Sequence, residues 1–268
     1  MGFFTGDLFS HALKLNTQVN VIFPDESSES AHLITGEPSV LYLLHGLSDN
    51  ASAWTRFTKL EYYAKKYNFI VVMPEAGRSF YTDMRLGQPY FTYIADELPE
   101  LLGRWLRLPD TREKTFIAGQ SMGGYGAVKA GLSRPERFGG IGCLSGALDV
   151  GGLLEADKGV SLEEALFFPG EKYAVFGADL NILSSEKPIE LIRGASALER
   201  KPKLIQVCGT EDFLLKANRD FKAACDRIGY PVKYMEWQGA HTWLFWDGAI
   251  QRVMQFFCGL DPDTQPLD

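Results

Sequence analysis

The chain has 268 residues, of which 46% are hydrophobic and 23% charged, and its formal net charge is -7. This length and composition are typical of a globular protein, and we expect one large α/β domain that spans residues 1–268. The negative charge and the lack of a basic cluster in the sequence argue against binding to nucleic acid or to an anionic membrane surface.

The sequence also favours a cytoplasmic protein that does not enter the membrane. No apolar run approaches the length of a membrane-spanning helix. The first residues include Asp7 where a secretory signal needs positive charge, and they lack a long apolar core. Four cysteines lie far apart in apolar contexts, without metal-ligand spacing, so we expect reduced thiols and no metal site. They are Cys143, Cys208, Cys225 and Cys258.

Segments typical of strands and of helices alternate along the chain. We expect strands at residues 18–23, 40–44, 69–73, 115–118, 140–144, 204–208 and 232–237. We expect helices at residues 60–67, 93–108, 123–133, 215–228 and 243–257. Pro99 lies inside the second of these helices, which should therefore begin or kink there. This alternation predicts a mostly parallel sheet with helices on both faces.

Residues 115–126 combine an apolar strand, a Gly-x-Ser-x-Gly turn and the start of a helix. This arrangement is the nucleophile elbow of the α/β-hydrolase fold, in which the serine hydroxyl is presented at the top of the sheet. Gly119 and Gly123 flank Ser121 because a side chain at either position would crowd so tight a turn. The segment therefore predicts an α/β-hydrolase with Ser121 as its nucleophile.

In that fold, an anion site forms between the elbow and the turn that follows the third strand. The strand at 40–44 ends in His45-Gly46-Leu47, and Gly46, which lacks a Cβ, would let this turn approach a substrate. We assign the two oxyanion donors to the backbone N–H groups of Leu47 and Met122. We interpret His45 as a buried, hydrogen-bonded residue that shapes the loop rather than as a proton-transfer group.

An acid and a base follow Ser121 in the order that the fold requires, with the histidine last. His241 is the one histidine after Ser121, and it lies in a small-residue loop between a strand and a helix. The strand at 204–208 runs into Glu211 and Asp212. We choose Asp212 as the acid because its shorter side chain suits this position, and Glu211 is the alternative.

The proposed roles follow the chemistry of a serine, histidine and aspartate triad. His241 would take the proton of Ser121 and return it to the leaving group, while Asp212 would hold the imidazole, and an acyl-enzyme would form and be hydrolysed. Asp149 and Asp179 also lie between serine and histidine, although neither follows a strand as cleanly. The acids after the strand could instead simply cap the next helix.

Residues 149–198 do not fit the alternation, and we expect them to form a small cap of short helices over the mouth of the active site. The alternative is a surface excursion without substrate contact. Aromatic and small residues near the motifs are candidates for contact with the substrate. They are Gly46, Trp54, Tyr81 and Trp243.

With these residues in place, the chain resembles the tributyrin esterase branch of the esterase D-like family. That family also holds S-formylglutathione hydrolases and the feruloyl and acetyl xylan esterases of carbohydrate esterase family one. The matching segments are residues 40–46, 71–74, 80–83, 115–126, 144–146 and 237–243. The resemblance implies hydrolysis of short-chain acyl esters, including acetylated sugars, a small-molecule ester as the partner, no metal or organic cofactor, and assembly into homo-oligomers.

Other functions stay open at this point. A feruloyl esterase would share the same motifs. S-formylglutathione hydrolases carry a different, cysteine-bearing loop after the third strand, where this chain has Leu47-Ser48-Asp49-Asn50. An acyltransferase of this fold would be exported, whereas the chain lacks a signal pattern. A catalytically inactive hydrolase fold used for binding would have lost a triad member, and all three are present.

Overall fold

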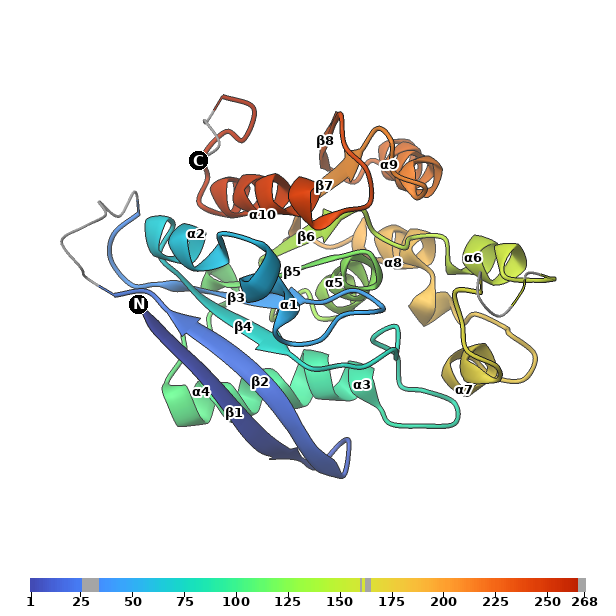
Figure 1. Cartoon of the computed structure of the whole chain (residues 1–268). Coiled ribbons are helices and arrows are strands. Elements are labelled where there is room, and N and C mark those ends of the chain that lie inside the picture. Colours follow the sequence, from blue (N-terminus) through green and yellow to red (C-terminus); the bar gives the residue numbers. More distant parts are fainter. Residues whose placement is uncertain (26–33, 160, 162–164, 265–268) are drawn as a thin grey trace.

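The computed structural model describes residues 1–25, 34–159, 161 and 165–264. Its centre is an eight-stranded sheet in the order β1-β2-β4-β3-β5-β6-β7-β8 (Figure 1). The strands are β1 (Gly2–Ser10), β2 (Leu15–Phe23), β3 (Ser39–Leu44), β4 (Phe69–Pro74), β5 (Thr115–Gln120), β6 (Gly140–Leu144), β7 (Lys203–Gly209) and β8 (Lys233–Trp237). All pairs from β4 to β8 in this order are parallel, while β1–β2 and β2–β4 are antiparallel. The expected mostly parallel sheet is confirmed.

Helices cover both faces of the sheet (Figure 1). The helices of the described residues, not all of which lie in these layers, are α1 (Ala53–Phe57), α2 (Leu60–Lys66), α3 (Tyr90–Thr92), η1 (Tyr93–Glu97), α4 (Leu98–Leu106), η2 (Arg112–Lys114), α5 (Met122–Ser133), α6 (Val150–Ala156), α7 (Glu171–Phe176), η3 (Ser184–Glu186), α8 (Pro188–Ala195), α9 (Leu215–Ile228) and α10 (Trp243–Phe257). Side chains of α4, α5, α8 and α9 fill one hydrophobic core, and those of α2 and α10 fill the other.

Strand β3 shows how one apolar run serves both cores. Val40, Tyr42 and Leu44 belong to the first core. Leu41 and Leu43, which point to the opposite face, belong to the second. A strand with helices on both sides is apolar at every position, so its sequence is a continuous hydrophobic run rather than an alternating one.

Strand β1 was not predicted from the sequence. It pairs with β2 along its whole length, from Gly2 opposite Phe23 to Ser10 opposite Leu15. It is an edge strand that keeps most of its side chains exposed, so the hydrophobic alternation that marks a half-buried strand is missing.

The helical segment around Pro99 is continuous rather than broken. It runs from α3 through the π-helical turn η1 into α4, and it ends at Arg107, whose φ is 51°. Pro99 has no N–H to donate to the preceding turn, and the wider π turn directly before it is where the hydrogen-bond ladder changes register. The predicted start or kink at Pro99 is therefore replaced by a local change of helix type.

The sheet topology brings distant parts of the chain to one edge. The carboxyl ends of parallel strands lie on the same side of a sheet, and loops that carry chemistry gather there. The segments that follow β3, β5, β7 and β8 contain Leu47, Ser121, Asp212 and His241 respectively. Separately, no helix among the described residues has both the length and the apolar character needed to cross a membrane.

The segment 149–198 has two structural parts, with residues 160 and 162–164 outside the described ones. Helices α6 and α7 lie at one end of the molecule, clear of the helix layers (Figure 1). Helix α8, in contrast, packs against α5 and α9 and belongs to the layer that covers the sheet. Helix α8 is therefore part of the α/β layers rather than an excursion from them.

Candidate active site

Ser121 sits in the sharp turn between β5 and α5, with φ 55° and ψ -118°. A side chain has no room on either flank of this turn. A Cβ on Gly119 would lie 2.5 Å from the backbone of Gly123, and a Cβ on Gly123 would lie 2.5 Å from the carbonyl oxygen of Leu44. The backbone N–H of Ser121 donates to the carbonyl of Leu144 at 2.9 Å, which anchors the turn to the neighbouring strand β6.

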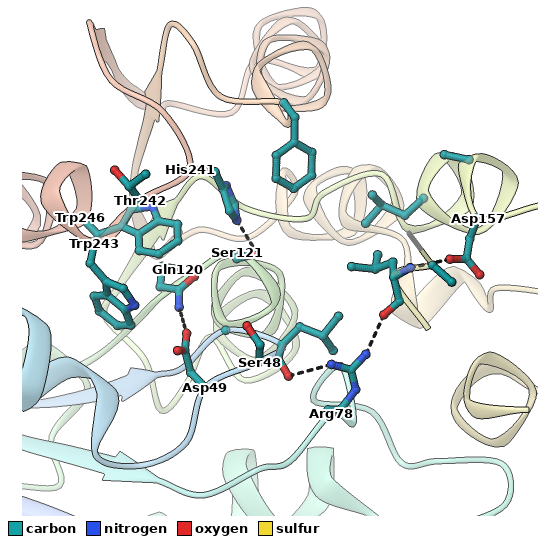
Figure 2. Close-up of a pocket in the computed structure, with 17 residues that line it drawn as sticks. Ser48, Asp49, Arg78, Gln120, Ser121, Asp157, His241, Thr242, Trp243 and Trp246 are labelled. Atoms are coloured by element: carbon teal, nitrogen blue, oxygen red, sulfur yellow. Dashed lines mark hydrogen bonds between the residues drawn. The ribbon is translucent and has the colours of Figure 1, made fainter. Parts of the chain in front are cut away.

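The structure brings Ser121, His241 and Asp212 into one hydrogen-bonded chain, of which Figure 2 shows the bond between Ser121 and His241. His241 Nε2 lies 2.9 Å from Ser121 Oγ, and His241 Nδ1 lies 2.8 Å from Asp212 Oδ2. An ionised carboxylate only accepts hydrogen bonds, so Nδ1 carries the imidazole proton and Nε2 is free to accept the serine proton. This is the tautomer that a general base needs.

The surroundings of Asp212 keep its carboxylate ionised. Burial raises the pKa of Asp212, but hydrogen bonds from His241, from the N–H of Leu214 and from Ser145 lower the pKa further, to below its usual value. The Asp212 side chain is fully buried, and the Leu214 N–H lies 2.8 Å from Oδ1. The acid therefore presents a negative charge to the imidazole throughout the neutral range.

The other acids considered from the sequence lie elsewhere. Glu211 is exposed, and its carboxylate accepts from Gln238 instead of His241. Asp149 caps α6 by accepting the N–H of Gly152, and Asp179 accepts the N–H of Asn181. The helix-capping role suggested for the acids after β7 is not found, because α9 has no side-chain cap and Asp212 bonds the N–H of Leu214, which precedes the helix.

His45 holds the turn that carries Leu47. His45 Nε2 accepts the backbone N–H of Ala76 at 3.0 Å, so Nδ1 carries the proton and donates to the carbonyl of Gly46 at 2.8 Å. In a trans peptide the C=O and N–H point in opposite directions, so this bond also orients the Leu47 N–H. Met122, the other expected donor, opens α5, where the first N–H groups lack partners within the helix.

The carboxylate of Glu75 lies beside the same turn, and its ionisation makes the stability of the protein depend on pH. Burial raises the pKa of Glu75, but the backbone N–H groups of Gly77 and Ala51 donate to its carboxylate and hold the pKa below its usual value. Because the pKa of Glu75 is lower in the folded than in the unfolded protein, the ionised carboxylate stabilises the fold at pH values above the unfolded-state pKa near 4.5. This stabilisation is lost as pH falls toward 2.

We therefore expect Glu75→Gln to destabilise the protein at pH 7 by at most about 3 kcal/mol, a difference that shrinks steadily between pH 4.5 and pH 2. Urea unfolding of both proteins across this range measures the difference. If the difference in free energy of unfolding between the two proteins stayed constant with pH, the ionisation of Glu75 would not be its cause.

Two of the four expected substrate contacts are corrected by the structure. Trp54 and Tyr81 are each 1% exposed and do not line the cavity. Trp54 Nε1 donates to the carbonyl of Leu44 at 3.0 Å, and the Tyr81 hydroxyl donates to that of His45 at 2.8 Å. Both aromatic rings therefore lie in the core and hold the backbone just before the oxyanion turn, because a buried indole N–H or phenol O–H needs a hydrogen-bond partner.

A cavity of about 800 Å³ opens over Ser121, and both Gly46 and Trp243 line it. Figure 2 shows Trp243 and Trp246 on one side of Ser121. Arg78 lies on the opposite side (Figure 2). The rest of the lining combines apolar and polar residues, and it includes four apolar residues from the segment between β6 and α7. These are Leu153, Ala156, Ala165 and Leu166.

Arg78 is a site residue that sequence analysis missed. Its guanidinium forms two short bonds to the Glu171 carboxylate, at 2.6 and 3.0 Å, and donates to the carbonyl of Leu166 at 2.6 Å. It also reaches the carbonyl of Leu47 at 3.4 Å. Arg78 thus ties the oxyanion turn to α7, and no local pattern could indicate a pair separated by 93 positions.

Comparison with known proteins identifies the chain. The family model named Esterase matches residues 10–257, which is most of the sequence. The chain belongs to this esterase family. The expected membership in the esterase D-like group is confirmed, and the protein is an α/β-hydrolase that acts on small-molecule esters as a serine carboxylesterase.

Relatives of this esterase match over nearly the whole chain. An acetyl esterase from Caldicellulosiruptor saccharolyticus is 32% identical, covering 93% of this chain and 96% of that protein. The solved structure of FphF, a fluorophosphonate-binding serine hydrolase of Staphylococcus aureus, superposes with a TM-score of 0.84 at 29% identity, over 96% and 98% of the two chains. An S-formylglutathione hydrolase, FrmB, of the same organism gives a TM-score of 0.81, with the same identity and coverage.

Proposed function

We propose that this esterase hydrolyses short-chain acyl esters, from acetyl to butyryl, of neutral alcohols that include sugars. The observation that carries the proposal is the chain from Ser121 Oγ through His241 to the buried carboxylate of Asp212, which lies at the cavity of about 800 Å³. A serine activated in this way attacks an acyl carbon and forms an acyl-enzyme, which water then hydrolyses.

In this mechanism His241 removes the proton from Ser121 as Oγ attacks the ester carbonyl. The backbone N–H groups of Leu47 and Met122 receive the oxyanion, a role worth roughly 3 kcal/mol for each donor. His241 then protonates the leaving alcohol and later activates the attacking water. Asp212 keeps the imidazole in the required tautomer and stabilises the imidazolium. The residues described perform every step, so the proposal needs no metal or organic cofactor.

Two tryptophans support a narrow acyl site. Trp243 packs edge to face against Trp54 and against Trp246, with ring centroids 5.1 and 5.2 Å apart. Indole rings held in this way form a rigid wall beside Ser121, which suits a short acyl chain. We propose that Trp243 and Gly46 contact the acyl ester, and that the apolar region toward α6 accepts the alcohol.

Replacement of Trp243 by alanine should therefore widen the range of acyl chains. We expect the ratio of kcat/KM for p-nitrophenyl octanoate to kcat/KM for p-nitrophenyl acetate to be at least about tenfold higher in the variant than in the wild type. Each additional methylene group that an apolar site can accommodate favours the longer ester. Trp105→Ala on α4, where the ring is 58% exposed, is the matched control and should leave the ratio unchanged. An unchanged ratio in Trp243→Ala would place the acyl group elsewhere.

An S-formylglutathione hydrolase is the second candidate, and the 29% identical FrmB structure favours it. The charges of the cavity favour a neutral substrate instead. Among the described lining residues, Arg78 is the one lysine or arginine, and its guanidinium already pairs with Glu171, while Asp49 and Asp157 also line the cavity. Two carboxylates of a glutathione thioester would meet little free positive charge there.

A comparison of kcat/KM tests both candidates together. The panel consists of p-nitrophenyl acetate, butyrate and octanoate, methyl ferulate, an acetylated xylo-oligosaccharide and S-formylglutathione. The proposal expects a steep fall beyond butyrate and cleavage of the acetylated sugar. Preference for S-formylglutathione would transfer the function to the second candidate, and preference for methyl ferulate would make the cavity a hydroxycinnamoyl site.

Three further proposals concern the cap, the cellular location and the oligomeric state of the enzyme. We propose that α6 and α7 act as the cap within 149–198, since Leu153 and Leu166 reach the cavity. A cytoplasmic location is supported by the cysteines, all of which are free thiols, three of them buried. Assembly into homo-oligomers is proposed from the family resemblance alone, and analytical ultracentrifugation would test it.

A further inference from the structure

The side chain of Gln120 lies between the nucleophile elbow and the oxyanion turn. Gln120 directly precedes Ser121, is 1% exposed, and is still among the residues that line the cavity. A Cβ on Gly46 would lie 2.4 Å from Gln120 Nε2 and 2.7 Å from Oε1, so the amide packs directly against the backbone of the turn. Gly46 in turn precedes Leu47, the proposed oxyanion donor. The amide is therefore close to the place that an acyl carbonyl would occupy between Ser121 and Leu47.

Asp49 fixes the orientation of this amide. Gln120 Nε2 donates to Asp49 Oδ2 at 2.7 Å (Figure 2). Oε1 of Gln120 is buried and meets no hydrogen-bond donor among the residues that the structure describes. A buried acceptor without a partner is unfavourable for folding, and a methionine of similar length would avoid that penalty. A glutamine at this position indicates that the amide has a role other than stability.

Asp49 presents a free acceptor to the cavity. Its side chain is half-buried and lines the cavity, and its backbone N–H holds the loop by donating to the carbonyl of Gly46 at 3.2 Å. Oδ2 is occupied by Gln120, while Oδ1 has no hydrogen-bond or ion-pair partner in the described part of the chain. Figure 2 places Asp49 and Gln120 on the same side of Ser121 as Trp243. The free oxygen therefore belongs to the side of the cavity proposed for the acyl group.

We propose that Asp49 binds a hydroxyl group on the acyl part of the substrate, that Gln120 positions Asp49 for this contact, and that the enzyme therefore prefers short hydroxyacyl esters, such as those of lactic or 3-hydroxybutyric acid. The inference rests on the proposed acyl site beside Trp243. One free acceptor matches a hydroxyl, which has one proton to donate, better than an ammonium group, which has three. An alkyl chain at the same place would remove water from the carboxylate and offer no hydrogen bond in return.

Pairs of esters that differ in one hydroxyl group test the proposal. p-Nitrophenyl 3-hydroxybutyrate is compared with the butyrate, and p-nitrophenyl lactate with the propionate, so the leaving group stays constant. Asp49→Asn keeps an oxygen that can accept from Gln120 and replaces the free oxygen by an NH₂ group. We expect the ratio of kcat/KM for the hydroxylated ester to kcat/KM for the plain ester to fall about tenfold in at least one pair, because the bond to a charged acceptor is lost.

The ratio is insensitive to two other effects. Comparison of the variant with the wild type cancels the intrinsic reactivity of each ester, and both esters of a pair meet the same protein sample, so partial loss of folded protein does not change the ratio. An unchanged ratio in both pairs would overturn the inference. If the wild type hydrolyses none of the plain esters, the proposed function fails instead, so the two failures are distinguishable.

Asp96→Asn is the matched control. Asp96 is also a half-buried acid, its carboxylate accepts two bonds from Arg134 at 2.6 and 2.7 Å, and it does not line the cavity. The ratio for each pair of esters should therefore be the same in Asp96→Asn as in the wild type. A tenfold fall in this control would show that the ratio responds to any loss of negative charge, and the assignment to Asp49 would be wrong.

Gln120→Met tests the positioning role separately. It removes the donor that holds Asp49 Oδ2 and keeps a side chain of similar length. We expect the same ratio to fall about threefold, mainly through a higher KM for the hydroxylated ester, because the carboxylate is present but no longer oriented. In an Asp49→Asn background, Gln120→Met should change the ratio less than about twofold. A threefold fall in that background would mean that Gln120 does not act through Asp49.

Discussion

Replacement of Ser121 by alanine is expected to lower kcat for p-nitrophenyl acetate by about five to six orders of magnitude. The hydroxyl of Ser121 is the group from which His241 Nε2, 2.9 Å away, takes a proton. Without that oxygen no acyl-enzyme can form, and only the oxyanion donors and the cavity remain to assist water. The substitution removes one atom from a turn whose backbone is anchored elsewhere, so the fold should persist.

Steady-state turnover and labelling by a fluorophosphonate probe measure this effect in two independent ways. Ser121→Ala should lose labelling completely, since the probe reports a nucleophile rather than binding. Ser133→Ala, at the far end of the same helix α5, is the control and should keep both activities. Wild-type hydrolysis by Ser121→Ala would disprove the elbow assignment.

Replacement of Asp212 by asparagine is expected to lower kcat by about four orders of magnitude with little change in KM. The carboxylate accepts the proton of His241 Nδ1 at 2.8 Å. An amide can turn its NH₂ group toward Nδ1, which moves the imidazole proton to Nε2, and Nε2 can then no longer accept from Ser121. The loss thus comes from the wrong tautomer in a nearly intact structure.

Glu211→Gln is the matched control, because Glu211 is the adjacent acid, is exposed and does not contact His241. It should keep kcat within about twofold, as surface substitutions away from special contacts usually do. The reverse pattern, with Glu211→Gln inactive and Asp212→Asn active, would transfer the acid role to Glu211. Thermal unfolding of both variants excludes loss of folded protein as the cause.

Most of the central fold could be predicted from the sequence because its signals are local. Buried parallel strands such as β3 and β5 are continuous apolar runs, and the Gly-x-Ser-x-Gly turn follows one of them directly. The edge strand β1 was missed because exposed side chains hide its pattern. The break expected at Pro99 was replaced by a π turn, since neighbouring turns can absorb a missing N–H without ending a helix.

The order of Ser121, Asp212 and His241 along the chain was enough to predict which residues would meet. The structure places them within hydrogen-bonding distance although 120 positions separate the serine from the histidine. This works because parallel strands deliver their carboxyl ends to one edge of the sheet, so residues that follow different strands converge. The family resemblance rests on the same segments, and the family comparison confirms it.

By itself, the sequence determined the fold class, the esterase family and the three residues of the candidate triad. Only the tertiary structure decided that Trp54 and Tyr81 face the core and that Arg78 joins the oxyanion turn to α7. The physical reason is the distance along the sequence between the residues that determine each feature. A turn or a strand is encoded by neighbouring residues, whereas the direction of a side chain and its hydrogen-bond partner depend on which distant segment packs beside it.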